Sequence, residues 1–179
     1  ALRLDALSHP ALGSLRAQLV DELVTLAADV PASRRALGIS PAQDAEIARN
    51  AALRSAPTLP AIARYTGVLY DALAVGSALF GLLRADDPVP GYRLSATSAL
   101  PGRPGLAGRW KPLLEPVLAA IGAGELVVDL RSSAYVPFWR PAKGRAERVA
   151  TVRVLHDYIR WETPRWAKVI KDANIVMVE

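Results

Sequence analysis

Polar residues that could bind an anion follow two apolar, strand-like stretches of the sequence. The first group follows the Leu-Phe-Gly-Leu-Leu run of residues 79–83, and the second is the Asp-Leu-Arg-Ser-Ser-Ala-Tyr run of residues 129–135. Ligand clefts of α/β folds commonly lie beyond strand ends, and guanidinium groups bind oxyanions and phosphates bidentately. The predicted cleft, for an anionic metabolite or a nucleotide, consists of Arg84, Tyr92, Arg93, Asp129, Arg131, Ser132 and Tyr135. An internal ion pair that fixes the strand ends, such as Arg93 with Asp129, explains the same residues equally well.

A glycine turn between two helical stretches is a second candidate, as a site for DNA. Residues 36–41 read Ala-Leu-Gly-Ile-Ser-Pro, and helix-hairpin-helix motifs use such a turn so that backbone N–H groups hold a phosphate. The match is partial, because Ser40 replaces the usual second glycine and Asp44 replaces a small residue. Two ordinary helix caps in series are the alternative. The predicted DNA contacts, including nearby arginines that add charge, are Gly38, Ile39, Ser40, Arg34, Arg35, Arg49 and Arg54.

An amphipathic helix expected over residues 163–174 is the third candidate. Its basic residues would form one stripe and its apolar residues would lie on the other side. The apolar side is expected to pack on a sheet, and the basic side to face outward, where it could follow DNA phosphates or simply be solvated. The basic stripe consists of Arg165, Lys168 and Lys171, and the apolar side of Trp166, Val169, Ile170 and Ala173.

Familiar catalytic and metal-binding patterns are absent from the sequence. It contains no Gly-x4-Gly-Lys-Ser/Thr phosphate loop, no Gly-x-Gly-x-x-Gly, no His-Glu-x-x-His and no Gly-x-Ser-x-Gly. Cysteine is absent, and the two histidines, His9 and His156, are far apart and lack suitably spaced carboxylates. No catalytic residue, metal or cofactor is therefore expected, and an enzymatic role is less favoured than a binding role.

Charge is unevenly distributed along the chain. Residues 1–130 contain 12 basic and 12 acidic residues, whereas residues 131–179 contain 10 basic and 5 acidic residues and so carry the whole net charge of +5. Such asymmetry favours an anionic partner such as nucleic acid, with a solvated basic surface as the alternative. No apolar run reaches the roughly 18 residues of a membrane span, and the first residues do not resemble a signal peptide. A cytoplasmic location without membrane contact is expected.

Local patterns predict a mixture of helices and strands within a single domain of residues 1–179. Helices are expected over residues 10–29, capped by Ser8, over a short turn ended by Gly38, from a capping box at residues 40–43 to about residue 53, and over residues 110–121. Strands are expected at residues 62–65, 78–82, 126–130, 149–156 and 175–178. The fold class is therefore α/β (or α+β), with one mixed β-sheet flanked by helices and a helix-hairpin-helix-like segment in the N-terminal third.

Several short blocks, in order along the chain, resemble the YaaA family. Residues 77–84 (Ser-Ala-Leu-Phe-Gly-Leu-Leu-Arg) match the family's Ser-Gly-Leu-Tyr-Gly-Leu-Leu-Arg, and residues 65–73 (Tyr-Thr-Gly-Val-Leu-Tyr-Asp-Ala-Leu) match its aromatic-x-Gly-x-Val-Tyr-x-Gly-Leu. Residues 92–94 and 129–135 resemble two further blocks. The family's initial strand, a helical stretch before Ala74 and a C-terminal Lys-x-x-Arg-Gly-like segment are not recognisable. The resemblance covers roughly residues 35–155.

The resemblance implies a peroxide-stress protein that binds DNA and helps to limit free intracellular iron. DNA binding would favour DNA structure over base sequence, because phosphate contacts carry no sequence information. The alternative is an enzyme or small-ligand protein that uses the predicted cleft.

Overall fold

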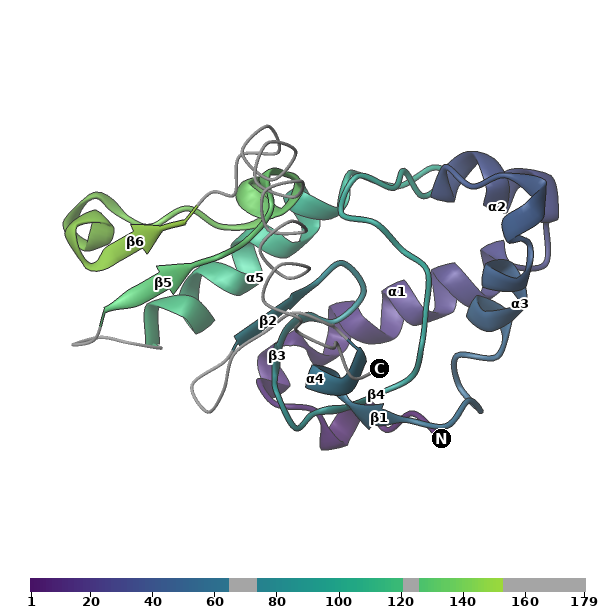
Figure 1. The fold of residues 1–179 in the computed structure, drawn as a ribbon, viewed down its shortest axis with the longest axis horizontal. Coiled ribbons are helices and arrows are strands. Elements are labelled where there is room, and N and C mark those ends of the chain that lie inside the picture. The colour runs from purple at the N-terminus through teal and green to yellow at the C-terminus, as the bar shows by residue number, and fades with distance from the viewer. Residues whose placement is uncertain (65–73, 121–125, 153–179) are drawn as a thin grey trace, which may run out of the picture.

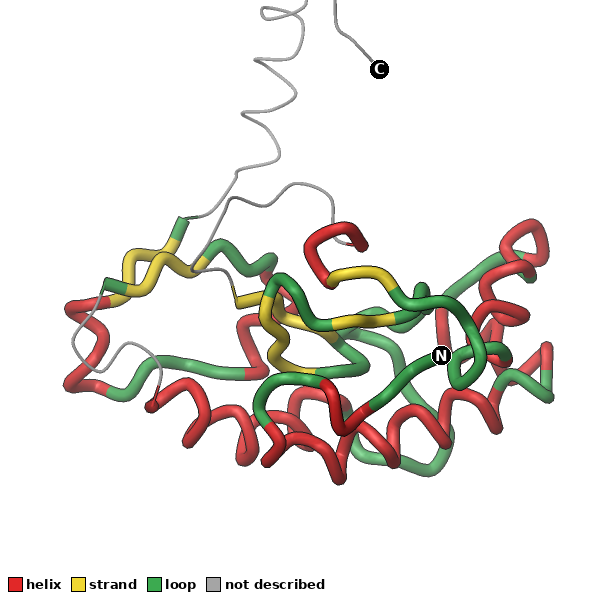
Figure 2. The backbone as a smooth tube through the Cα atoms, turned by 90° about the horizontal axis from the view of Figure 1, so that it is seen from below, coloured by secondary structure: helices red, strands yellow, loops and turns green. Residues whose placement is uncertain are grey.

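The computed structural model describes residues 1–64, 74–120 and 126–152. Figure 1 shows the chain running from a helical N-terminal part to a projecting pair of strands near residue 150, and Figure 2 shows the long helices on one side and most strands on the other. The α-helices are α1 (Gly13–Leu26), α2 (Val30–Leu37), α3 (Ala45–Ala51), α4 (Ala61–Arg64) and α5 (Leu106–Ala120). Short 3-10 helices are η1 (Leu4–Ala6), η2 (Pro10–Leu12), η3 (Pro41–Gln43), η4 (Ser133–Phe138) and η5 (Lys143–Arg148).

The N-terminal helices follow the local signals of the sequence. Helix α1, with η2 before it, confirms the helix expected over residues 10–29 and buries Leu15, Leu19 and Leu23 on one face. Helix α2 ends at Gly38, which adopts the left-handed conformation with φ 63°. The capping box at residues 40–43 is also present, although it opens η3 before α3 begins. Ser8 does not cap a helix; its backbone N–H and hydroxyl donate to the Asp87 carboxylate.

The strands pair two by two. Strand β1 (Leu59–Pro60) is antiparallel to β4 (Pro88–Val89), β2 (Ala74–Ser77) is antiparallel to β3 (Gly81–Arg84), and β5 (Val127–Asp129) is parallel to β6 (Val149–Thr151). The combination of helices and strands confirms the expected α/β class. Within the described ranges, however, the strands form three two-stranded sheets rather than one mixed sheet.

The strand expected at residues 62–65 was wrong, and of the strand expected at residues 78–82 only Gly81 and Leu82 belong to a strand, β3. Of the strand expected at residues 62–65, the first three residues belong to helix α4. Residues 78–80 form a turn between β2 and β3, because the Ser77 hydroxyl accepts the Phe80 N–H at 2.9 Å and Gly81 has φ 73°. The expected C-terminal helix and last strand lie outside the described residues, as does the end of the strand expected at 149–156.

A buried arginine joins the β2–β3 hairpin to α1. The Arg16 guanidinium donates to the carbonyl oxygens of Phe80 at 2.9 Å, Leu82 at 2.7 Å and Ser8 at 2.7 Å. Burial lowers the pKa of Arg16 to about 10, and nearby Asp87 opposes that shift. The fully buried Trp110 of α5 also binds the hairpin, because its indole N–H donates to the Ala78 carbonyl at 2.9 Å. Both long helices therefore hold the hairpin in place.

Candidate functional site

A cavity of about 110 Å³ lies where the β2–β3 hairpin, α5, β5 and η4 meet. Its walls are mainly apolar, and they include the side-chain-free surfaces of Gly76 and Gly81. Three residues of the predicted cleft line it, namely Asp129, Arg131 and Tyr135. The structure therefore brings together the half of the predicted cleft that follows β5.

The charged groups at this cavity are bound to one another. Arg131 forms two hydrogen bonds with the Asp129 carboxylate, Nε to Oδ1 at 2.8 Å and Nη2 to Oδ2 at 2.8 Å. Its guanidinium also donates to the carbonyls of Tyr135 and Trp139 and lies 5.2 Å from the Trp139 ring centroid. The ion pair suggested between Arg93 and Asp129 is therefore wrong in its partner, because Arg131 is closer in sequence and occupies the carboxylate.

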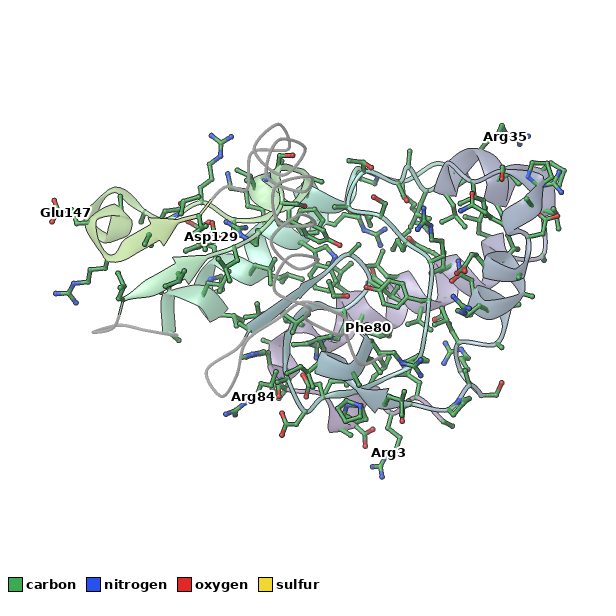
Figure 3. All side chains as sticks on the ribbon, in the orientation of Figure 1. Arg3, Arg35, Phe80, Arg84, Asp129 and Glu147 are labelled. Atoms are coloured by element: carbon green, nitrogen blue, oxygen red, sulfur yellow. The ribbon has the colours of Figure 1, made fainter. Side chains whose placement is uncertain are left out.

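The other predicted cleft residues lie away from the cavity lining. Tyr92 lies next to the lining, because its hydroxyl is 2.7 Å from the Ser77 Oγ, and Ser77 lines the cavity. Arg84 is exposed at the end of β3, and Figure 3 shows it well apart from Asp129. Arg93 is exposed, and its backbone exchanges two hydrogen bonds with the buried Asn50 side chain. Ser132 is exposed and precedes η4.

Sequence reasoning did not select Ser77 as a cleft residue, although it begins the block that resembles the YaaA family. Its hydroxyl accepts the Phe80 N–H and meets the Tyr92 hydroxyl, and so connects the hairpin turn to the loop after β4. A serine three residues before an N–H in a turn is a recognisable local signal. The contact with Tyr92 has no such signal.

The predicted DNA-binding turn has a helix–turn–helix course, but the backbone N–H groups of Ile39 and Ser40 already donate within the chain. The Ile39 N–H donates to the Arg34 carbonyl at 3.2 Å, and the Ser40 N–H to the Gln43 side-chain oxygen at 3.1 Å. Ile39 is buried, whereas Gly38 and Ser40 are exposed.

Most arginines near this turn are paired with acids. The Arg34 guanidinium donates to the Asp44 carboxylate, Nε to Oδ1 at 2.8 Å and Nη2 to Oδ2 at 2.5 Å. The hydrogen bond from Arg34 lowers the pKa of Asp44. Arg49 pairs with Glu46 at 2.7 Å, and Arg54 pairs with Asp21. Arg35, labelled in Figure 3, is exposed and has no ion pair within the described parts of the chain. The positive charge of this surface is therefore largely neutralised.

A second basic surface, which sequence reasoning did not single out, lies between β5 and β6. Residues 140–148, hereafter the basic segment, contain four basic residues and one acidic residue, which gives a net charge of +3. Arg140 and Arg148 are exposed, and neither has an ion pair among the residues that the structure describes. Figure 1 shows η5 and β6 at one end of the molecule, and Figure 3 places Glu147 at its tip. The excess of basic residues from residue 131 onward is the feature of the sequence from which this basic surface could have been predicted. The predicted contacts Arg165, Lys168 and Lys171 lie outside the described residues.

Within residues 1–64, 74–120 and 126–152, no three His, Asp or Glu side chains are grouped as metal ligands would be. No helix of those ranges has the length and hydropathy needed to cross a membrane.

Comparison with known proteins identifies the family. A family model described as peroxide stress protein YaaA matches residues 71–163. A UPF0246 protein of Corynebacterium efficiens is 41% identical over 170 residues, which cover 86% of this chain and 66% of that protein. UPF0246 proteins of Streptomyces coelicolor and Corynebacterium glutamicum are each 39% identical, over 87% and 83% of this chain. The chain spans 64–66% of the length of these relatives. It belongs to the peroxide stress protein YaaA family.

Proposed function

We propose that this chain is a cytoplasmic DNA-binding protein of the peroxide stress response, which helps to limit free iron and DNA damage. The family description supports the stress role. DNA binding is proposed from the basic segment, because Arg140 and Arg148 are exposed there and have no ion pair among the described residues. In this proposal iron limitation does not require the chain to ligate iron, because the sequence has no cysteine and two distant histidines.

Arginines that have no ion pair among the described residues favour the basic segment over the glycine turn as the main DNA contact. A guanidinium group that binds a DNA phosphate displaces condensed counterions, and their release favours binding. An arginine already bound to a carboxylate must give up that partner to gain the phosphate, so its net contribution is smaller. Arg34, Arg49 and Arg54 have such partners. Contacts from the basic segment would go to the DNA backbone and would therefore depend on DNA structure more than on base sequence.

The experiment is a fluorescence-anisotropy titration of labelled duplex and branched DNA at about 0.1 M salt. Each phosphate contact is worth about eightfold in affinity at that salt, relative to 1 M. The double variant Arg140→Ala/Arg148→Ala is therefore expected to bind roughly 60-fold more weakly than the unmodified protein. Arg54→Ala is the matched control, because Arg54 is exposed but paired with Asp21, and it should change the affinity only slightly. Absence of binding to every DNA form at low salt would overturn the proposal.

The cavity favours a second candidate, a protein that binds a small anionic metabolite or nucleotide. Its apolar walls suit a flat apolar group, and Tyr92, Ser77 and the Asp129–Arg131 pair lie at or next to them. A melting-temperature shift across a panel of nucleotides and metabolites detects such a ligand. A Cβ at Gly76 would meet only the Tyr135 ring, at 3.9 Å, so Gly76→Leu can fill the cavity and should abolish the shift. Arg93→Ala is the control, because Arg93 lies outside the lining. No shift with any compound rejects this candidate.

A further inference from the structure

Two arginine side chains converge on Gly91, in the loop after β4. Arg49 comes from α3 and Arg64 from the end of α4, so two different helices supply the guanidinium groups. A Cβ placed on Gly91 would lie 3.8 Å from Nε of Arg49 and 3.5 Å from Nη1 of Arg64. Because glycine has no side chain, both guanidinium groups border the same small space, hereafter the Gly91 space.

Other hydrogen bonds hold both guanidinium groups in position. Arg64 donates through Nε to the Val89 carbonyl at 3.3 Å and through Nη2 to the Pro57 carbonyl at 3.1 Å. Arg49 donates through Nη1 to both carboxylate oxygens of Glu46, at 2.9 and 2.7 Å. The two nitrogens that border the space, Nη1 of Arg64 and Nε of Arg49, have no acceptor among the residues that the structure describes. Each arginine therefore keeps a donor for a further group.

The positive charge around this space is only partly compensated. Glu46 pairs with Arg49, whereas the two carbonyls bound to Arg64 leave its charge in place, and no ion pair of Arg64 occurs in the described ranges. Like charges that border one space repel each other. Arg64 is half-buried, so salt and water screen its charge less than that of an exposed arginine. An anion in the space would relieve this repulsion and accept hydrogen bonds from both nitrogens.

The donor set suits a phosphate group. Guanidinium groups match the oxygens of carboxylates and phosphates, and these charge-assisted hydrogen bonds are the strong ones. A phosphate monoester carries a charge of about −1.5 to −2 at pH 7 and three acceptor oxygens, so one group can bind two arginines at once. A carboxylate offers only one negative charge for the same two partners.

We propose that Arg49 and Arg64 bind a phosphate group in the Gly91 space. The phosphate can belong to a small phosphorylated molecule or to a DNA strand, and the experiments below distinguish these sources. Figure 1 shows α3 and α4 well away from β6 and the basic segment. The proposal therefore stands whether or not the basic segment binds DNA.

The first test is thermal unfolding of the whole chain with added inorganic phosphate or glycerol 3-phosphate, at constant ionic strength. A ligand at about ten times its Kd should raise the melting temperature by roughly 3–6 °C. Phosphate also stabilises proteins without binding to a site, so the comparison is made with Gly91→Asn. The asparagine side chain fills the Gly91 space and should abolish the part of the shift that comes from the site. Gly91 is not among the glycines with positive φ, so a side chain is compatible with its backbone.

The second test places an anion in the space through the chain itself. Gly91→Asp has the same size as Gly91→Asn but brings a carboxylate between the two guanidinium groups. At low salt it should melt higher than Gly91→Asn by roughly 1–4 °C, and the difference should shrink as salt is added. In an Arg49→Gln background the difference should also shrink, because one of the two guanidinium groups is gone.

DNA titration identifies the source of the phosphate. If a DNA strand supplies it, Gly91→Asn should bind duplex DNA about eightfold more weakly at about 0.1 M salt, the effect of one phosphate contact. If a small molecule supplies it, the DNA affinity should stay the same while the shift with glycerol 3-phosphate is lost. Two results contradict the proposal. One is that Gly91→Asn changes neither the phosphate shift nor the DNA affinity, and the other is that the aspartate and asparagine variants melt at the same temperature at low salt.

Discussion

Gly81 is the position where a single added methyl group should be most damaging. It has φ 73°, a backbone conformation that side chains disfavour, and a Cβ placed there would lie 2.6 Å from the Cζ3 atom and 2.9 Å from the Cε3 atom of Trp110. Trp110 is fully buried and fixed by its hydrogen bond to Ala78. The ring cannot move away without breaking that bond. Gly81→Ala should therefore both strain the backbone and overpack the core.

The expected loss follows from these two effects. The left-handed backbone costs about 1–2 kcal/mol and overpacking about 1–3 kcal/mol, together about 2–5 kcal/mol. A protein of this size has a total stability of about 5–15 kcal/mol, so the loss is large. The melting temperature should fall by roughly 4–20 °C.

Urea denaturation followed by tryptophan fluorescence measures the change in unfolding free energy, and two glycine controls separate its causes. Gly102→Ala should cost only the backbone strain, because Gly102 has φ 66° with no atom near its Cβ position. Gly108→Ala should be neutral or stabilising, because Gly108 lies within α5 with open space around it. In a Trp110→Leu background, the cost of Gly81→Ala should shrink towards that of Gly102→Ala. If Gly81→Ala costs no more than Gly102→Ala in the unmodified protein, the reasoning is refuted.

Three other substitutions test the contacts that hold the hairpin and its neighbouring loops. Arg16→Lys keeps the positive charge, but one ammonium group cannot donate to all three carbonyls, so the urea midpoint should fall by the equivalent of about 1–3 kcal/mol. An unchanged midpoint would show that the three hydrogen bonds of the guanidinium group do not stabilise the fold. Asn50→Ala removes both hydrogen bonds to the Arg93 backbone and should cost about 1–3 kcal/mol, whereas a neutral result would mean that the loop is held elsewhere. Burial lowers the pKa of His9 below its usual 6.5; Arg16 and Arg84 add to this shift, and Asp87 opposes it. On acidification the unfolded chain therefore binds a proton at His9 before the folded protein does, so the stability falls as the pH drops below about 6.5. His9→Asn cannot titrate and suits the φ of 59°, so its melting temperature should fall less on acidification than that of the unmodified protein, and an equal fall would exclude His9 as the cause.

The helical N-terminal part could be predicted from sequence because its signals are local. Gly38 ends a helix and the capping box at residues 40–43 begins another, and both depend only on neighbours in the chain. The turn at residues 78–80 could not be predicted, because its apolar residues suit a strand equally well. The Ser77 hydroxyl and Gly81 favour this turn locally, but Trp110, about thirty residues away, and the Arg16 guanidinium from α1 also bind it, and neither partner is visible in the local sequence.

The candidate sites show the same division between local and distant contacts. Asp129, Arg131 and Tyr135 line one cavity because a few residues of chain keep them together. Arg84 and Arg93 carry guanidinium groups that could bind an anion, but both side chains are exposed and lie away from the cavity.

A count of charged residues in the sequence also does not reveal which arginines form ion pairs. Arg54 is neutralised by Asp21, thirty-three residues earlier, and a pair so distant in the sequence cannot be predicted from residue spacing. The glycine turn therefore looked more basic in the sequence than it is in the fold.

The central claim is that the basic segment binds DNA phosphates, and the salt dependence of binding tests it most directly. The logarithm of the association constant is measured against the logarithm of salt concentration for the unmodified protein and for Arg140→Ala/Arg148→Ala. Each lost phosphate contact lowers the magnitude of the slope by about 0.9. The slope of the double variant should therefore be smaller by about two, with Arg54→Ala close to the unmodified protein. An identical slope in the double variant and the unmodified protein would contradict the account.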